Sequence, residues 1–301
     1  MAQNSQLFPS APGIVSRRRV FSFRRVRRQI RSIPVYLVFV IWAVAVVFPL
    51  VWMFYTSLKT NRELYASVWG LPALPQIGNY IRAWTQGDLG VAILNSLFYS
   101  IGSVGLSSLT GAMAAYVLSR FRFAGRLSIF YYFMAGVFIP CSLTIIPTFL
   151  LMRDLHLINS HFGLLLVYTG WNVPFAVFVL NGYFKTIPSE LMDAAAIDGC
   201  SRFAVFWRIV LPLGRSGIVA VSILNFLWVW NDLLFALVLA RSDILKPLPL
   251  AVDTVKTTTY LSGDWVMVFA AASVMTIPLL IGYILLQRQI VEGATIGALK
   301  G

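Results

Sequence analysis

Residues 185–215 have the sequence KTIPSELMDAAAIDGCSRFAVFWRIVLPLGR, which is dense in charge and alanine within an otherwise apolar chain. Runs without charged residues flank it on both sides, close to the length of about 20 residues that crosses the hydrocarbon core of a bilayer. The stretch therefore predicts a large loop between two membrane spans.

The composition excludes the ordinary soluble classes. Hydrophobic residues form 58% of the 301 residues and charged residues 12%, against about 25% charged in soluble domains, and the mean hydropathy is +0.78. Apolar runs predict an all-α polytopic membrane protein with one six-helix domain over 33–287 and no second, soluble domain. The six predicted spans lie at about 34–58, 93–118, 127–151, 162–184, 217–240 and 265–287.

Basic residues are distributed unevenly between the two sides of this predicted bundle. Eight of the 24 lie between Arg17 and Arg31, in an arm over 1–32. With this arm in the cytoplasm, the inner segments hold 17 basic residues and the outer loops hold seven, so the positive-inside rule places both termini, including the tail 288–301, in the cytoplasm. The arm also suits anionic membrane lipid, and the placement of the +13 net charge beside a span disfavours a nucleic-acid partner.

Small residues recur at every fourth position of the second predicted span: Ser103, Ser107, Gly111 and Ala115. Such a stripe lets two membrane helices approach closely, and packing within the chain is the favoured explanation. Prolines inside the spans, at positions 49, 140, 147, 174 and 278, predict kinks.

Within 185–215 the pattern predicts two short helices joined by a turn. Pro188 suits the first turn of a helix, and Gly199 can end that helix in a left-handed conformation. Ser201 can cap a second helix over 202–211. Residues of the first helix that share one nearly bulk-free face are Leu191, Ala194, Ala195 and Asp198.

Two functions fit this pair of helices equally well on spacing alone. An amphipathic inner loop could pack on its own bundle or on lipid headgroups. A small, rigid face edged by Glu190 and Asp193 could instead be the docking surface of a cytoplasmic protein.

Asp232 is the one ionisable residue well inside a predicted span, and it follows Asn231. A carboxylate at this depth is a candidate for a substrate or gate contact, because its desolvation is costly. The alternative, which we favour, is a helix cap or an interhelical hydrogen bond near the outer interface.

The loop resembles the EAA loop of ABC-importer permeases, with the pattern E-A-A-x-x-x-G followed by I-x-L-P. The matching residues are 193–199 (DAAAIDG) and 209–212 (IVLP), with Asp193 where the family usually has glutamate. The resemblance implies a coupling helix between spans four and five, seated in a cleft of an ATPase subunit. The residues that it implies for coupling are Glu190, Asp193, Ala194, Ala195, Asp198 and Gly199.

Further stretches are similar to the carbohydrate branch of these permeases, and to its maltose-type second permease subunit. They are Asn79-Tyr80, Ala114-Ala115-Tyr116, Trp230-Asn231-Asp232 and the terminal Gly297-Ala298-Leu299-Lys300-Gly301.

The resemblance implies a non-catalytic subunit of a sugar importer in the bacterial inner membrane. A second, homologous permease would complete the pathway, two copies of a cytoplasmic subunit would bind ATP and Mg, and an external sugar-binding protein would deliver the sugar. This chain itself would hold no cofactor and no metal. Its sequence lacks the G-x-x-x-x-G-K-[ST] phosphate loop, so ATP hydrolysis would belong to the partner subunits.

Two alternative functions remain at this stage. An ion-coupled secondary transporter would need membrane carboxylates on several spans, whereas only Asp232 qualifies. An ABC permease for a solute other than a sugar would carry the same loop.

Overall fold

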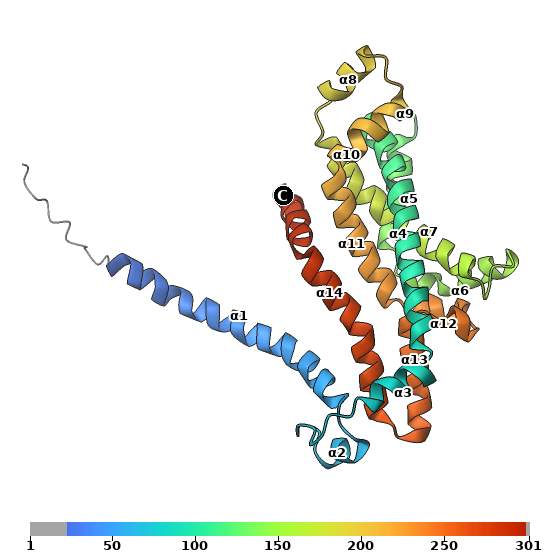
Figure 1. The fold of residues 1–301 in the computed structure, drawn as a ribbon. Helices are drawn as coiled ribbons and strands as arrows, with labels where there is room; N and C mark the ends of the chain where they lie inside the picture. Colours follow the sequence, from blue (N-terminus) through green and yellow to red (C-terminus); the bar gives the residue numbers. More distant parts are fainter. Residues whose placement is uncertain (1–22, 299–301) are drawn as a thin grey trace, which may run out of the picture. The chain divides into compact units, whose positions relative to one another are not determined.

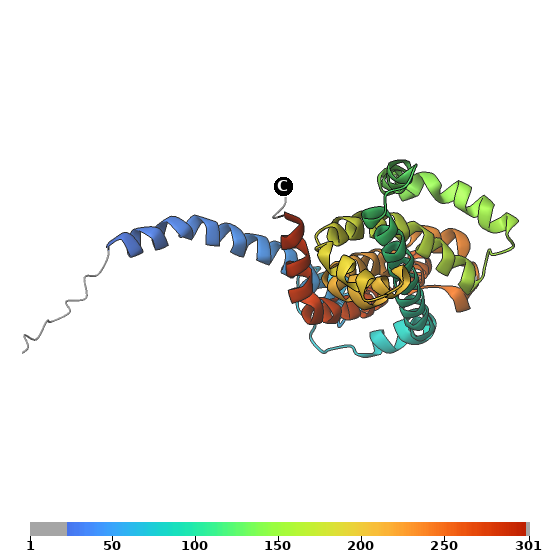
Figure 2. The same ribbon diagram turned by 90° about the horizontal axis from the view of Figure 1, so that it is seen from above.

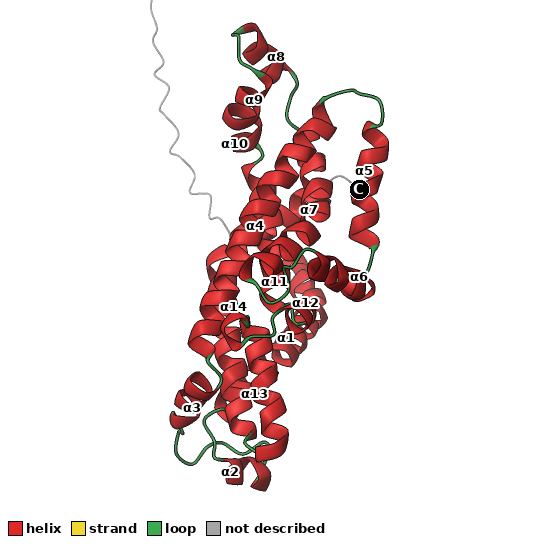
Figure 3. Cartoon of the chain, turned by 90° about the vertical axis from the view of Figure 1, so that its right-hand side faces the viewer, coloured by secondary structure: helices red, strands yellow, loops and turns green. Residues whose placement is uncertain are grey.

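The computed structural model describes residues 23–298, with side chains described at 34–285 and at 287. All regular structure in this range is helical (Figure 3), which confirms the predicted all-α class. The chain divides after Val51 into two units, which we describe separately. Residues 1–22 of the predicted basic arm and 299–301 of the predicted tail lie outside the described range.

The helices have the following bounds. They are α1 Phe23–Thr56, α2 Asn61–Ala66, α3 Gly78–Gln86, α4 Leu89–Arg120, α5 Arg126–Phe138, α6 Cys141–Asp154, α7 His161–Lys185, α8 Glu190–Ile197, α9 Arg202–Val205, the π-helix η1 Phe206–Val210, α10 Leu211–Leu213, α11 Arg215–Asn231, α12 Leu234–Leu239, the 3-10 helix η2 Asp243–Leu245, α13 Leu248–Ser262 and α14 Trp265–Ala298.

Four described helices are long and apolar enough to cross a membrane. They are Pro34–Thr56 of α1, α4, α7 and the part of α14 from Trp265 to Leu285. Two bent pairs raise the number to six if each pair is one span: α5 with α6, and α9–α10 with α11. The six-span topology therefore stays a prediction, with four spans formed by single helices.

The predicted span 127–151 was wrong as one continuous helix. It breaks at Ile139–Pro140, and α5 and α6 meet at 106°. Proline lacks an amide hydrogen and its ring disfavours helical geometry in the preceding residue, and Ile139 is in fact extended. In Figures 1 and 2, α6 lies on the outside of the bundle, where it packs against α12.

The predicted span 217–240 is also interrupted, because α11 ends at Asn231 and α12 begins at Leu234. Beyond it, the predicted polar loop contains the 15-residue helix α13, whose Leu248, Ala251 and Val255 are buried. The sequence of α13 mixes apolar and polar residues, so its pattern alone did not predict a helix. Its buried face is defined by its contacts with α14 and α4 in the tertiary structure.

The second unit is built around the pair α4 and α7, which makes the most extensive helix–helix contact. The small-residue stripe of α4 is buried at this contact, and a Cβ on Gly111 would lie only 2.6 Å from the Cβ of Ala176. Close approach within the chain, as predicted, is therefore the role of this stripe. Figure 1 shows α8 at one end of the unit and α2, α3 and α13 at the other, and we call these the α8 end and the α3 end.

Candidate functional site

The helix α8 lies where the sequence predicted the first helix of the loop. It begins at Glu190, two residues after Pro188, and ends before Gly199, whose φ of +79° confirms the predicted left-handed turn. The Oγ of Ser201 then accepts a 3.2 Å hydrogen bond from the amide of Ala204, which confirms the predicted cap of the second helix.

The second helix of the loop is not a uniform α-helix. Its first turn, α9, passes into the π-helix η1 at Phe206 and then into α10. Phe206 and Val210 of the π-helix are buried in the same core cluster as Phe184 of α7. A π-helix is rare and frequently marks a functional segment.

The structure separates the four residues that were predicted to share a free face of α8. Ala195 is buried in the core cluster with Ile187 and Val205, so its side chain is not available to a partner. Leu191, Ala194 and Asp198 are exposed, as are Glu190 and Asp193. Ile197 was not singled out from the sequence, although its side chain is 87% exposed and is the most prominent apolar group on this helix.

Arg120, the last residue of α4, holds the segment that leads into α8. One Nη2 atom donates to the carbonyl oxygens of Phe184 and Ile187, the latter at 2.6 Å. Phe184 lies in the last turn of α7, where its carbonyl oxygen also accepts from the amide of Ile187 at 3.2 Å, and Ile187 follows the helix.

The end of α4 also contacts the other side of the loop. The hydroxyl of Tyr116 donates a 3.1 Å hydrogen bond to the carbonyl oxygen of Arg202, and the Arg202 guanidinium lies 4.9 Å from the centre of the Phe121 ring. Sequence reasoning assigned Arg120 only to the positive-inside count and Tyr116 only to a family pattern. The hydrogen-bond acceptors of both side chains lie on segments that are distant in sequence, so this role could not be read from local patterns.

Asp193 faces the same junction, where it lines a cavity of 480 Å³ together with Arg120, Arg122 and Arg126. The coupling role of Asp193, which this location does not test, stays a prediction.

Asp232 lies at the break between α11 and α12, and its side chain is bound within the chain. Its Oδ2 accepts hydrogen bonds from the hydroxyl of Tyr168 at 2.9 Å and from the amides of Phe235 at 3.2 Å and Ala236 at 3.3 Å. Asp232 therefore both caps the start of α12 and forms a hydrogen bond to α7, which are the two roles that the favoured interpretation named. The neighbouring Asn231 is exposed and donates to the carbonyl oxygen of Leu227 at 2.7 Å.

A second polar feature inside the bundle was missed from the sequence. A cavity of 270 Å³ lies between α5, α7 and α11, lined by Gly136, Trp171, Asn172, Phe175, Asn225 and Trp228 among others. The rings of Trp171 and Trp228 stack with centroids 5.9 Å apart and planes 19° apart. Sequence reasoning searched the spans for ionisable residues, whereas a search for uncharged amides in apolar runs could have found Asn172 and Asn225.

Both of these amides carry a buried nitrogen without a partner. The Nδ2 atoms of Asn172 and Asn225 have no hydrogen-bond partner among the residues that the structure describes, although each side chain is 3% exposed. Leaving a buried amide unpaired costs about 1–3 kcal/mol, so two such groups at one cavity call for a physical reason.

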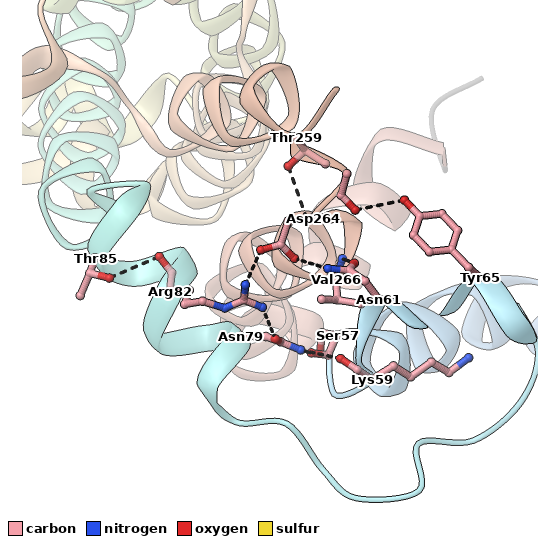
Figure 4. A network of polar contacts seen from close by, with 11 residues as sticks. Ser57, Lys59, Asn61, Tyr65, Asn79, Arg82, Thr85, Thr259, Asp264 and Val266 are labelled. Carbon is pink, nitrogen blue, oxygen red and sulfur yellow. Dashed lines mark hydrogen bonds and ion pairs between the residues drawn. The ribbon is translucent and has the colours of Figure 1, made fainter. Parts of the chain in front are cut away.

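Polar contacts at the α3 end join the segment between α1 and α4 to the start of α14 (Figure 4). Asn79 donates to the carbonyl oxygens of Ser57 at 2.7 Å and Lys59 at 2.8 Å, and its Oδ1 accepts from Arg82 at 2.6 Å. Arg82 also forms an ion pair with Asp264, whose other oxygen accepts a 2.8 Å hydrogen bond from Asn61. Asn79, which the sequence linked to the carbohydrate branch, is therefore the centre of a structural network.

Lys59 is fully buried beside this network. Its ammonium donates to the carbonyl oxygens of Ser67 at 3.2 Å and Val68 at 2.9 Å, and it lies 5.1 Å from the centre of the Tyr55 ring. Burial lowers the pKa of Lys59, which the charge of Glu63 partly offsets.

In the part of the chain with described side chains, no group of three or more His, Cys, Asp or Glu could hold a metal ion.

Comparison with known proteins gives the class of this fold. Residues 107–293, more than half of the chain, match the family described as binding-protein-dependent transport system inner membrane component. The fold is similar to a chain in the crystal structure of a bacterial ABC transporter involved in the import of the acidic polysaccharide alginate. The TM-score is 0.76 at 23% identity, over 86% of this chain and 96% of that one.

Two relatives are similar over most of their length. The chain is 34% identical over 261 residues to the diacetylchitobiose uptake system permease protein NgcG of Streptomyces coelicolor, covering 87% of this chain and 86% of that protein. It is 35% identical over 260 residues to the arabinooligosaccharides transport system permease protein AraQ of Halalkalibacterium halodurans, covering 85% and 91%.

The family match and the two permease relatives define the class of protein as an ABC-importer permease. The chain belongs to the family of binding-protein-dependent transport system inner membrane components, which confirms the family predicted from the loop.

Proposed function

We propose that this chain is a transmembrane subunit of an ATP-driven sugar importer, and that it forms half of the pathway and catalyses no reaction itself. The observation that carries the proposal is its 34–35% identity, over more than four-fifths of its length, to permeases named for the uptake of diacetylchitobiose and arabinooligosaccharides. Oligosaccharides of this kind are therefore the substrate class that we assign to the complete importer.

In this proposal, α8 is the coupling helix, and α4 holds the segment that leads into it. The exposed Ile197 and the carboxylates of Glu190, Asp193 and Asp198 would face a cleft of the ATPase subunit, while the buried Ala195 attaches the helix to its own bundle. ATP and Mg would bind to two copies of that cytoplasmic subunit. Motion transmitted through α8 would then drive alternating access in the two permease subunits.

A further part of the proposal concerns location and partners. Both termini would lie in the bacterial cytoplasm, with the α8 end inside and the α3 end outside. A second, homologous permease would pack beside the bundle, and an external sugar-binding protein would dock at the α3 end. The internal binding of Asp232 by Tyr168 and two amides weakens the ion-coupled alternative, which would need an available carboxylate.

The test of this function is uptake by purified complex in proteoliposomes. We expect co-purification of an ATPase and a second permease in mild detergent. With the binding protein outside and ATP inside, we expect uptake of radiolabelled diacetylchitobiose or arabinotriose. Uptake that followed a proton or sodium gradient without ATP would contradict the proposal and support a secondary transporter.

The coupling role of α8 has its own test. We expect Ile197→Asp to lower co-purification of the ATPase by about tenfold, because it places a charge in an apolar contact. Ile244→Asp in η2 is the matched control, since its side chain is 68% exposed and lies outside the loop. Equal recovery of the ATPase with both variants would contradict this role for α8.

A further inference from the structure

The cavity between α5, α7 and α11 has the surface chemistry of a site for a neutral, polyhydroxylated ligand. The stacked indoles of Trp171 and Trp228 form a continuous apolar wall, and the amides of Asn172 and Asn225 contribute hydrogen-bonding groups. Small-molecule sites typically combine an aromatic lining with a few placed polar groups. A sugar ring matches both, because its faces carry C–H groups and its edge carries hydroxyls.

The unpaired amides are the second, independent observation at this cavity. Each Asn side chain is almost completely buried, and each Nδ2 lacks a partner among the described residues. Rotation about the Cβ–Cγ bond can present either the amino group or the carbonyl oxygen to the cavity. An amide can therefore donate to one hydroxyl and accept from another, which would satisfy groups that the protein leaves unpaired.

The lining also indicates which ligands the cavity excludes. No described residue that lines it carries a charge, so an anionic or cationic solute would lose its hydration without gaining an ion pair. The volume of 270 Å³ is near the lower end of small-molecule sites, which begin at about 300 Å³, and so it suits one ring of a longer sugar.

The cavity lies near the middle of α7, within α11 and at the end of α5. Asn172 lies near the middle of α7, Asn225 lies within α11, and Gly136 lies just before the break that ends α5. Transport proteins commonly bind substrate near the bilayer midplane, next to interrupted helices. The α5–α6 and α11–α12 breaks are such interruptions.

We propose that Trp171, Asn172, Asn225 and Trp228 form a subsite through which this chain itself binds one neutral sugar ring during transport. The inference rests on the proposed import function and deepens it. It assigns the substrate contact to the amide and indole groups of α7 and α11, in place of Asn231 and Asp232.

The first test is ATP-driven uptake of radiolabelled diacetylchitobiose and arabinotriose by the complete importer in proteoliposomes. We expect Asn172→Ala and Asn225→Ala each to lower the rate about tenfold or more, because a site built for hydroxyls fails when its polar partner is removed. Asn181→Ala is the matched control: Asn181 is also buried in α7 with an unpaired side-chain oxygen, but it does not line this cavity. We expect it to retain uptake within about twofold.

The second test distinguishes binding from a structural role. In a Cys141→Ser, Cys200→Ser background, Val137→Cys, which lines the cavity but is not one of the four proposed binding residues, is treated with a methanethiosulfonate reagent, with and without diacetylchitobiose or arabinotriose. We expect the transported sugar to slow the modification. Ser222→Cys, which lines a separate cavity between α4, α11 and α14, is expected to react equally in both conditions.

The outcomes separate the two proposals. Uptake of neither sugar by the wild-type importer would overturn the proposed function and the subsite with it. Wild-type uptake combined with normal uptake by both Asn variants, or with no protection of Val137→Cys, would overturn the subsite and leave the import function intact.

Discussion

The guanidinium of Arg120 donates a 2.6 Å hydrogen bond to the carbonyl oxygen of Ile187, three residues before α8 begins. The same nitrogen contacts the carbonyl oxygen of Phe184, so one side chain at the end of α4 fixes both the end of α7 and the entry to α8. The position of α8 therefore depends on α4 as well as on the two helices that flank the loop.

Arg120→Gln is expected to uncouple the importer. Hydrogen bonds to charged groups contribute about 1.5–3 kcal/mol, so we expect a mobile α8 and a loss of sugar uptake of about tenfold or more. Uptake and ATPase activity of the reconstituted complex measure this effect, with assembly checked by co-purification. Arg122→Gln is the control, because Arg122 is exposed two residues later. Equal effects of the two variants would show that general charge, and not this contact, is important.

Gly111→Ala is expected to destabilise the α4–α7 pair. The new Cβ would lie 2.6 Å from the Cβ of Ala176, and such overpacking costs about 1–3 kcal/mol. Thermal unfolding in detergent should show a lower midpoint, and Ala176→Gly in the same chain should restore much of it. Gly105→Ala, which meets nothing within 4 Å, should leave the midpoint unchanged. If the unfolding midpoint of the double variant did not rise, the strain would not come from the contact between positions 111 and 176.

Gly199→Val is expected to abolish uptake while membrane insertion remains normal. Its φ of +79° is strained for a β-branched side chain, although there is open space around the position. Gly199→Asn tolerates this conformation better and should retain a substantial part of the uptake. Uptake together with membrane-fraction immunoblotting measures both effects. Normal transport by the valine variant would remove the coupling role from this turn.

Asp232→Ala is expected to destabilise the protein more than Asp232→Asn does. Alanine loses the cap of α12 and the bond to Tyr168, at a cost of about 0.5–2 kcal/mol for a cap, whereas asparagine keeps an acceptor oxygen. Thermal unfolding midpoints in detergent report the difference. A large loss of uptake by Asp232→Asn at unchanged stability would instead favour the substrate or gate contact.

Glu63 makes the stability of the α3 end depend on pH. Hydrogen bonds from the amides of Thr60 and Ala73 lower its pKa below the ordinary 4.5. Its stabilising effect is therefore complete above pH 4.5 and is lost as the pH falls through the lower, folded-state pKa. The protection factors of the amides of residues 60–73, which compare the measured exchange rates with the intrinsic rates at the same pH, should fall in that acidic range. Glu63→Gln should have low protection factors at every pH and lack this step, and an unchanged profile would contradict this assignment.

Local patterns predicted those features that depend on a few neighbouring residues. The limits of α8, the left-handed Gly199 and the cap at Ser201 follow from propensities and hydrogen bonds within one turn. The close contact of α4 and α7 was predictable because small residues recur on one helix face.

Features that depend on distant residues could not be predicted in this way. Hydropathy gives the length of the run 127–151, but the 106° bend at Pro140 depends on where α6 packs. The partners of Arg120 lie more than 60 residues away, and the cavity with Asn172 and Asn225 requires three helices to be placed together. Nor does the sequence show that Ala195 points inward while Ile197 points outward.

The network at the α3 end has a consequence for the order in which the protein folds. Asn61 and Asp264 are 203 residues apart, and Tyr65 and Gly263 are 198 apart. During synthesis, Arg82 and Asn61 emerge long before Asp264, so their hydrogen-bonding groups must stay hydrated until the segment that precedes α14 is made. This network can therefore form only after most of the chain has been translated, and a chain that stops before Asp264 would leave it without its carboxylate.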